Sequence, residues 1–98
     1  MPIITLTTDL GLKDHYVASI KGAILSQISE ISIVDVTHNI EAFNISQTAY
    51  VIRNCYKNFP KGSIHILGVD AELSIDNSHL AVFYDEHYFI GTDNGVFS

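Results

Sequence analysis

The alternation of strand-like and helix-like segments is the feature that most constrains how this chain can fold. Short apolar, β-branched runs occupy residues 3–8, 31–36 and 64–69, and each gap between them holds a helical pattern. Strands joined by crossovers of this length run parallel, and the right-handed connection places a helix against the sheet. The alternation therefore predicts an α/β fold with a mostly parallel sheet.

Apolar side chains recur at spacings of three and four in both gaps, as one face of a helix requires. The first helix is expected to span residues 14–27, with Asp14 as its N-cap and Gly22 packed closely on the sheet. The second is expected to span residues 45–59. The predicted apolar faces are Val17, Ile20, Ile24 and Ile28 in the first helix and Ile45, Ala49, Ile52, Tyr56 and Phe59 in the second.

Two further strands, at residues 80–84 and 88–92, are expected to form a hairpin around Asp85 and Glu86. The complete prediction is a three-layer, Rossmann-like α/β domain with a mostly parallel sheet, helices on both faces and a final hairpin. An Asp-Asn-Gly turn follows the hairpin, and such a turn precedes a further element, so we expect residues 1–98 to be a truncated domain.

Composition restricts the class of protein and its partners. Eleven acidic side chains against five basic ones give a net charge of −6, which disfavours nucleic acid and anionic membranes as partners. No apolar run approaches the roughly 20 residues that span a bilayer, and no signal-peptide pattern opens the chain. The single cysteine, Cys55, cannot form an internal disulfide, which fits a cytoplasmic location. A hydrophobic fraction of 47% predicts apolar surface that further chain or a partner subunit covers.

Three polar residues directly follow the predicted parallel strands: Asp9, His38 and Asp70. Since the ligand crevice of such a sheet lies outside the carboxyl ends of its strands, these residues are the first candidates for a functional site. Asp9 could bind ribose hydroxyls or a metal, or it could only stabilise its own turn. Asp70 could be a desolvated base that orients water, or the cap of a loop. Among the five histidines, His38 is the best candidate for a functional residue, because it follows the second predicted strand.

Other residues with chemical potential have structural interpretations as well. Phe43 could form an aromatic wall for a base or a sulfonium, or a hydrophobic staple for the second helix. His65 is expected to be packed inside its strand, His79 and His87 to be solvated beside the hairpin, and Cys55 to lie in the core. The sequence contains no metal-ligand spacing, Walker loop or dinucleotide-binding glycine motif, so no metal and no cofactor is expected.

Four blocks of the sequence together resemble one known family. They are IITLTTDLG and KDHYV within residues 3–17, IVDVTHNI at 33–40, FPKGSIH at 59–65 and DNGV at 93–96. In this order they closely resemble the start of the adenosine-forming S-adenosylmethionine (SAM) hydrolases. These enzymes are also called SAM hydroxide adenosyltransferases and are relatives of the fluorinating and chlorinating enzymes. The blocks extend over nearly the whole chain.

The resemblance implies the N-terminal α/β domain of a homotrimeric enzyme whose C-terminal β-rich domain is absent from residues 1–98. The substrate would lie between the N-terminal domain of one subunit and the C-terminal domain of the next, so these residues alone are expected to be inactive. The implied reaction is the hydrolysis of SAM, as substrate and without a cofactor, to adenosine and L-methionine. Water or hydroxide attacks the ribose 5′ carbon, and methionine leaves as a neutral thioether.

The resemblance also implies roles for individual residues. Asp9 resembles the acid that binds the ribose 2′ and 3′ hydroxyls, and Phe43 stands where the family has a wall of the substrate pocket. Asp14 and Tyr16 fall in the loop near the methionine end of the substrate. Asn94 falls in the turn beside the site.

Asp70 resembles the water-positioning acid of the family's Asp-Arg-His set, but the residues after it depart from the family pattern. The family commonly has D-P-G-V-G-T-x-R, whereas residues 70–77 are DAELSIDN. Asn77 stands where the family has arginine, and an asparagine donates hydrogen bonds without carrying a charge. The histidine of the set would lie beyond Ser98.

Two other functions are alternatives at this point. A non-catalytic nucleoside-binding protein would keep Asp9 and Phe43 and lose the chemistry through Asn77. A metal-dependent phosphohydrolase of the survival-protein type also has acids after its first strand, but it has N-D-D-G where this chain has T-D-L-G. Turnover of SAM and tight binding of a divalent metal are the observations that separate the three.

Overall fold

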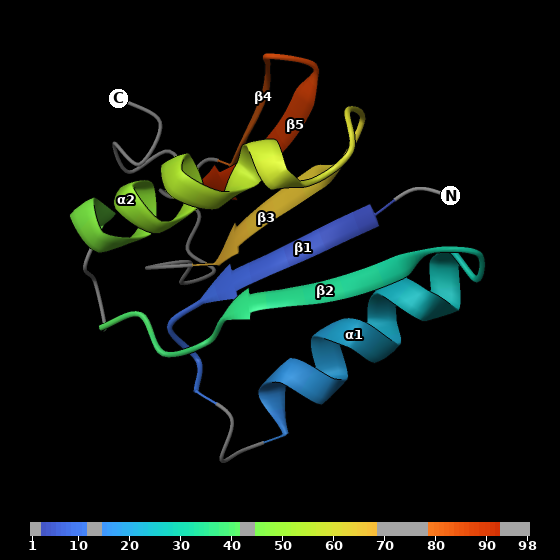
Figure 1. The fold of residues 1–98 in the computed structure, drawn as a ribbon. Coiled ribbons are helices and arrows are strands. Elements are labelled where there is room, and N and C mark those ends of the chain that lie inside the picture. Colours follow the sequence, from blue (N-terminus) through green and yellow to red (C-terminus); the bar gives the residue numbers. More distant parts are fainter. Residues whose placement is uncertain (1–2, 12–14, 42–44, 69–78, 93–98) are drawn as a thin grey trace.

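The computed structural model describes residues 3–11, 15–41, 45–68 and 79–92, which form a five-stranded sheet flanked by α-helices (Figure 1). In chain order the elements are β1 (Ile3–Thr8), α1 (Tyr16–Gln27), β2 (Ser32–Thr37), α2 (Ile45–Cys55), the 3-10 turn η1 (Tyr56–Asn58), β3 (Ile64–Gly68), β4 (His79–Tyr84) and β5 (His87–Thr92).

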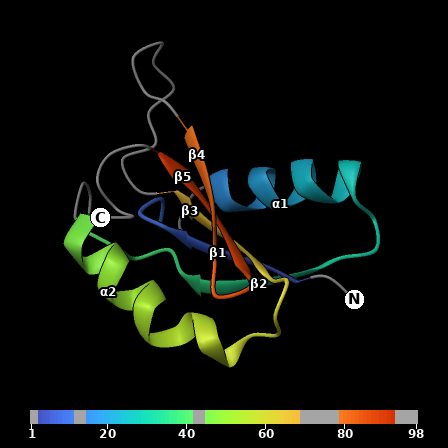
Figure 2. The same ribbon diagram turned by 90° about the horizontal axis from the view of Figure 1, so that it is seen from above.

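The sheet has the strand order β2-β1-β3-β5-β4, in which only β4 is antiparallel to its neighbour. Seen from above, α1 and α2 lie on opposite faces of the sheet (Figure 2). Each crossover follows a strand and precedes a parallel strand, so the helix between them packs back onto the sheet. The prediction of a mostly parallel α/β sheet with helices on both faces and a closing hairpin is confirmed.

Strand β1 lies between β2 and β3 in the interior of the sheet and is buried on both faces. Its side chains from Ile4 to Thr8 are all buried, and both Leu6 and Thr5 are fully shielded from solvent. A strand in this position must be apolar or carry small hydroxyls that find partners within the protein. The sequence of β1 is IITLTT, and the hydroxyls of Thr5 and Thr8 find such partners in His65 and His38. The Thr7 hydroxyl has no hydrogen-bond partner among the described residues.

The main core lies between the sheet and α2. It contains Ile52 and Tyr56 from α2 and η1, together with Leu67 of β3 and Phe89 of β5. Cys55 packs against this cluster and is partly buried, and burial raises the pKa of its thiol. The predicted apolar face of the second helix and the core position of Cys55 are therefore confirmed.

Helix α1 is held less tightly than the sequence predicts. Val17 is its only buried side chain among the described residues, and Ile28, just after the helix, is 45% exposed. A Cβ built on Gly22 would meet no atom within 4 Å, so the prediction that Gly22 packs closely on the sheet is wrong. The N-cap of α1 is His15, one residue later than predicted, and Asp14 lies outside the described residues.

The turn of the predicted hairpin has an unusual composition. Asp85 and Glu86 both adopt positive φ angles, of 52° and 63°, as the central residues of a type I′ turn do. Neither is glycine, so the conformation needs support from its surroundings. The Tyr56 hydroxyl donates to the Asp85 carboxylate at 3.1 Å, and the Gly62 amide donates to the Glu86 carbonyl at 2.7 Å.

Two histidines are stacked inside the α2 face of the sheet. His65 is fully buried, with Nδ1 2.7 Å from the Thr5 hydroxyl and Nε2 3.1 Å from Nδ1 of His87. The predicted packing of His65 is confirmed. His87 is only 3% exposed, so its predicted solvation is wrong. It alternates with Tyr88 along β5, which turns its ring inward beneath Tyr56.

Burial makes the stability of this fold sensitive to acid. Burial of the His65 ring, and to a smaller extent the neighbouring His87, lower its pKa from 6.5 to about 4. Because the unfolded chain has a His65 pKa of about 6.5, it binds more protons than the folded chain between these two values. The free energy of unfolding should therefore fall as pH drops from about 6.5 to 4, by about 3 kcal/mol in total.

The test compares urea unfolding of wild type and His65→Gln across this pH range, because glutamine keeps hydrogen-bonding groups and does not titrate. The variant should lose most of the dependence on pH above 4. Asp35 does not interfere, since its lowered pKa confines its contribution to pH values below its ordinary value of 3.8. Equal slopes for the two proteins would show that His65 does not cause the acid sensitivity.

Candidate functional site

The strand order identifies the sheet edge next to β1 as the place where a ligand is expected to bind. The carboxyl ends of β1, β2, β3 and β5 share one edge of the sheet (Figure 1). From β1 the chain crosses to β2 on one side, and from β2 it crosses back to β3 on the other side of β1. The connections thus diverge between β1 and β3, and in open α/β sheets ligands bind outside the carboxyl ends at such a point.

Asp9 lies at this point because it directly follows β1 and is half-buried. The next residues form a turn that is hydrogen-bonded to the loop after β2. The Gly11 amide donates to the His38 carbonyl at 2.7 Å, and the Ile40 amide donates to the Thr8 carbonyl at 3.3 Å. Gly11 has a φ of 73°, a left-handed conformation that glycine adopts without steric cost. The main chain around Asp9 is therefore held in one conformation.

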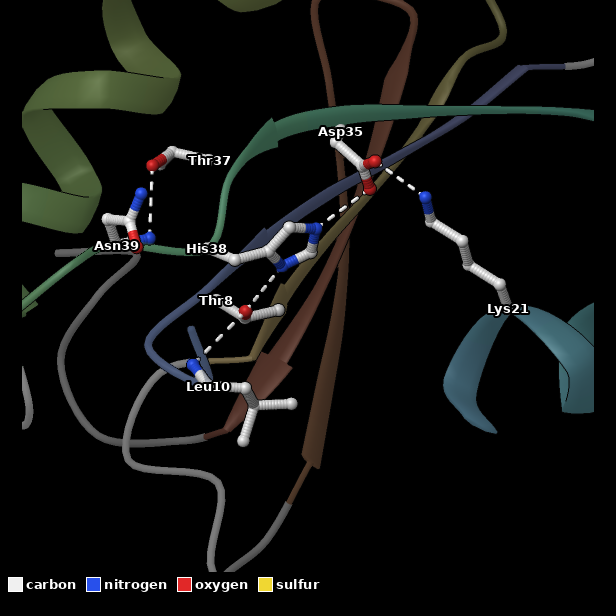
Figure 3. Close-up of polar contacts among 7 residues, drawn as sticks. All are labelled: Thr8, Leu10, Lys21, Asp35, Thr37, His38 and Asn39. Carbon is white, nitrogen blue, oxygen red and sulfur yellow. Dashed lines mark hydrogen bonds and ion pairs between the residues drawn. The ribbon is translucent and has the colours of Figure 1, made fainter. Parts of the chain in front are cut away.

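A relay of side chains lies behind this turn (Figure 3). His38 is 3% exposed, and both of its ring nitrogens have partners. Nδ1 lies 2.6 Å from the Thr8 hydroxyl, and Nε2 lies 2.7 Å from the Asp35 carboxylate. The other oxygen of Asp35 accepts a hydrogen bond from Lys21 of α1 at 2.5 Å. The Leu10 amide donates to the Thr8 hydroxyl at 3.3 Å.

The charge and protonation of these groups determine which atom donates in each hydrogen bond of the relay. Hydrogen bonds from Lys21 and then from His38 lower the pKa of Asp35, so its carboxylate is ionised at neutral pH and can only accept. Nε2 of His38 therefore carries a proton and donates it to Asp35. Because Thr8 accepts from the Leu10 amide, its hydroxyl proton is available to Nδ1 of His38. We assign this tautomer from the partners of each group.

A bulge at the end of β2 helps to bring Asp35 and His38 together. Residues three apart in a regular strand point to opposite faces of the sheet. Leu6 of β1 pairs with Asp35, but Thr7 pairs with Thr37, so Val36 is an extra residue in the register. Such an extra residue re-aims the side chains that follow it. The His38 ring can thus reach the carboxylate of Asp35 on the same side.

The structure describes three of the residues singled out from the sequence at this edge. Asp9 and His38 are joined through the turn after β1, as expected from the parallel strands. Tyr16 begins α1, is about half exposed and packs its ring against His15 at 4.6 Å between centroids. The sites assigned to Asp14, Phe43, Asp70, Asn77 and Asn94 lie outside the described residues.

Sequence reasoning missed Lys21 and Asp35, which complete the relay. Asp35 was visible as an acid inside a predicted apolar strand, an unusual position that calls for a partner. Lys21 carries no such signal, because it lies 14 residues away on an exposed part of a helix. Among the described residues no three His, Cys, Asp or Glu side chains could hold a metal ion. In the same residues neither helix is long and apolar enough to cross a membrane.

Comparison with known proteins identifies relatives over the whole chain. The (R)-S-adenosyl-L-methionine hydrolase of Methanocaldococcus jannaschii is 34% identical over 103 aligned residues, which cover all of this chain and 39% of that protein. The fluorinase of Actinopolyspora mzabensis is 36% identical over 63 residues, covering 64% of this chain and 21% of that enzyme. The chain thus spans about two fifths of the length of the hydrolase relative.

The fold agrees with these sequence matches. The crystal structure of an uncharacterised conserved protein from Thermotoga maritima superposes with a TM-score of 0.85 at 32% identity, over 96% of this chain and 36% of that one. Residues 4–98 match the family described as the SAM hydroxide adenosyltransferase N-terminal domain. The resemblance inferred from the four sequence blocks is confirmed, and the chain belongs to this family.

Proposed function

We propose that the protein hydrolyses SAM to adenosine and L-methionine. The observation that carries this proposal is the similarity, along the entire chain, to a relative named as a SAM hydrolase. The fluorinase relatives match a shorter part of the chain, 64% in the first of them, so hydrolysis is favoured over halide transfer. The chemical step is the attack of water on the ribose 5′ carbon. The C–S bond breaks, methionine leaves with the electron pair, and the water loses a proton.

In this proposal Asp9 binds the ribose diol. A carboxylate has two acceptor oxygens, which suits the two adjacent hydroxyls of a ribose. Its position after β1, in a turn whose main chain is hydrogen-bonded to the loop after β2, supports the role. A group held in this way loses little conformational entropy when it binds a ligand.

The water-positioning role is assigned to Asp70 with Asn77. Asp70 follows the last residue of β3, Gly68, by two positions. The sulfonium charge of SAM disappears in the transition state, so strong stabilisation of that cation would slow the reaction. Catalysis then depends on holding a water in line with the C–S bond, which Asp70 can do as an acceptor. Asn77 adds a neutral donor where the family has arginine.

The rest of the pocket follows from the family resemblance. Phe43 forms an aromatic wall, Asp14 and Tyr16 contact the methionine end, and Asn94 lies beside the site. We also propose that the full-length protein is a cytoplasmic homotrimer whose C-terminal β-rich domain completes the pocket. SAM is the substrate in this scheme, and no cofactor takes part.

The role of Asp9 is tested by its discrimination between two ligands. In the full-length protein Asp9→Asn should weaken adenosine binding about ten- to hundredfold, because a hydrogen bond to a charged group contributes about 1.5–3 kcal/mol. Binding of 2′-deoxyadenosine should weaken less, since that ligand lacks one of the two hydroxyls. Calorimetry measures both dissociation constants.

Glu30→Gln serves as the matched control because it removes the same charge near the start of β2, at the opposite edge of the sheet. Equal losses for both ligands in Asp9→Asn would assign Asp9 a structural role only.

Replacement of Asp70 tests the mechanism. Asp70→Ala should lower kcat for SAM about a hundredfold or more and leave KM nearly unchanged, since it removes an interaction made chiefly in the transition state. Asp76→Ala, which removes an acid of the same segment without an assigned role, is the control. Unchanged turnover in Asp70→Ala would overturn the hydrolytic mechanism and favour a nucleoside-binding protein.

Restoring the family's arginine provides a complementary gain of function. Asn77→Arg should raise turnover or lower the pH at which activity appears, because a nearby positive charge favours a hydroxide-like nucleophile. The measurement is the pH profile of kcat/KM in the full-length protein. A profile identical to that of wild type would show that position 77 does not act on the nucleophile.

A further inference from the structure

The hydrogen-bonded relay behind Asp9 runs from Lys21 through Asp35 and His38 to Thr8. It joins groups from α1, β2, the loop after β2 and the end of β1, and it terminates on the amide directly after Asp9. We propose that His38 is a positioning residue that holds Asp9 in place for the ribose diol. This inference rests on the proposed role of Asp9 and assigns no contact between His38 and the substrate.

The Thr8 hydroxyl is the link between His38 and the turn. The hydroxyl accepts from the Leu10 amide and donates to Nδ1 of His38 (Figure 3). It therefore connects the residue after Asp9 with the His38 ring. Thr8 is also 2% exposed, and its hydrogen bond with His38 is buried, which shields that bond from competing water. Rotation of the His38 ring would break its bond to Thr8, so the hydroxyl that accepts from the Leu10 amide would lose one of the two partners that orient it.

The ring of His38 is in turn fixed by an ion pair. Asp35 accepts from Nε2 of His38 at 2.7 Å and from Lys21 at 2.5 Å, with one carboxylate oxygen for each donor. The two bonds hold the carboxylate from two elements, β2 and α1. His38 is buried and occupied on both nitrogens, so a direct role as a ligand or a base would require breaking the relay. Positioning is the role compatible with this geometry.

The first test uses a pair of threonine variants in the full-length protein. Thr8→Val removes the linking hydroxyl and keeps the shape of the side chain. Thr7→Val is the matched control, because Thr7 is equally buried on the neighbouring position and its hydroxyl has no hydrogen-bond partner among the described residues. The readout is the ratio of the dissociation constants of 2′-deoxyadenosine and adenosine.

Thr8→Val should lower this ratio about fivefold, since the hydrogen bond from Asp9 to the diol is misaligned and weakened rather than removed. Thr7→Val should keep the ratio of wild type. A purely structural loss would weaken both ligands equally and would leave the ratio unchanged.

A second pair of variants tests His38 and keeps the inference falsifiable if Thr8→Val does not fold. His38→Asn places its amide near the position of Nδ1 and can still accept from Thr8. His38→Gln places its amide near the position of Nε2 and keeps only the contact with Asp35. The inference expects His38→Asn to retain the ratio of wild type and His38→Gln to lower it as Thr8→Val does.

Asp9→Asn is measured beside these variants to separate the two hypotheses. If Asp9→Asn lowers the ratio but neither Thr8→Val nor His38→Gln does, the positioning role is overturned and the proposed function stands. If Asp9→Asn keeps the ratio of wild type, the role of Asp9 fails and the inference fails with it. Equal ratios in His38→Asn and His38→Gln would also overturn the positioning role.

Discussion

The burial of β1 on both faces is the constraint on which the rest of this structure depends. A strand covered from both sides can expose polar groups only at its ends, and at its carboxyl end β1 leads into Asp9. Two of its three threonine hydroxyls form hydrogen bonds inside the protein, as buried polar groups generally do. Thr5 pairs with His65 and Thr8 pairs with His38, so two of the three buried histidines among the described residues are partners of β1. The core and the site share this strand.

The order of elements was predictable because crossover connections have a fixed hand and parallel strands share one edge. Apolar spacing alone located both helices and the strands, and it assigned Ile52 and Tyr56 to the core. The predictions for Gly22 and His87 were wrong because they depend on which face of the helix or strand the rest of the protein covers. Gly22 lies on a helix that packs mainly through Val17, and His87 points inward because of the phase of β5. A sequence pattern gives the period of a strand, but not which of its faces is covered.

The candidate site was only partly accessible to sequence reasoning. Asp9 and His38 were identified because each follows a predicted parallel strand. The ion pair of Lys21 with Asp35 was not, because it joins different elements. The contact of Asp35 with His38 was missed because it depends on a bulge at Val36 that breaks the regular alternation. Roles for residues such as Asp70 and Asn77 came from the resemblance to a family, since their types and spacing alone allow several functions.

The relay joins a strand that is buried on both faces to a helix that has few buried side chains, and this difference affects the dynamics of the molecule. Amides of a strand buried on both faces open to solvent only when the whole sheet opens, whereas a helix attached through few buried side chains opens locally. In hydrogen exchange, β1 should therefore belong to the slowest unit of the molecule and α1 to a faster one. Lys21 is the residue of the relay that lies on the faster unit, so transient opening of α1 would remove the Lys21 partner of Asp35 while His38 still binds the other carboxylate oxygen.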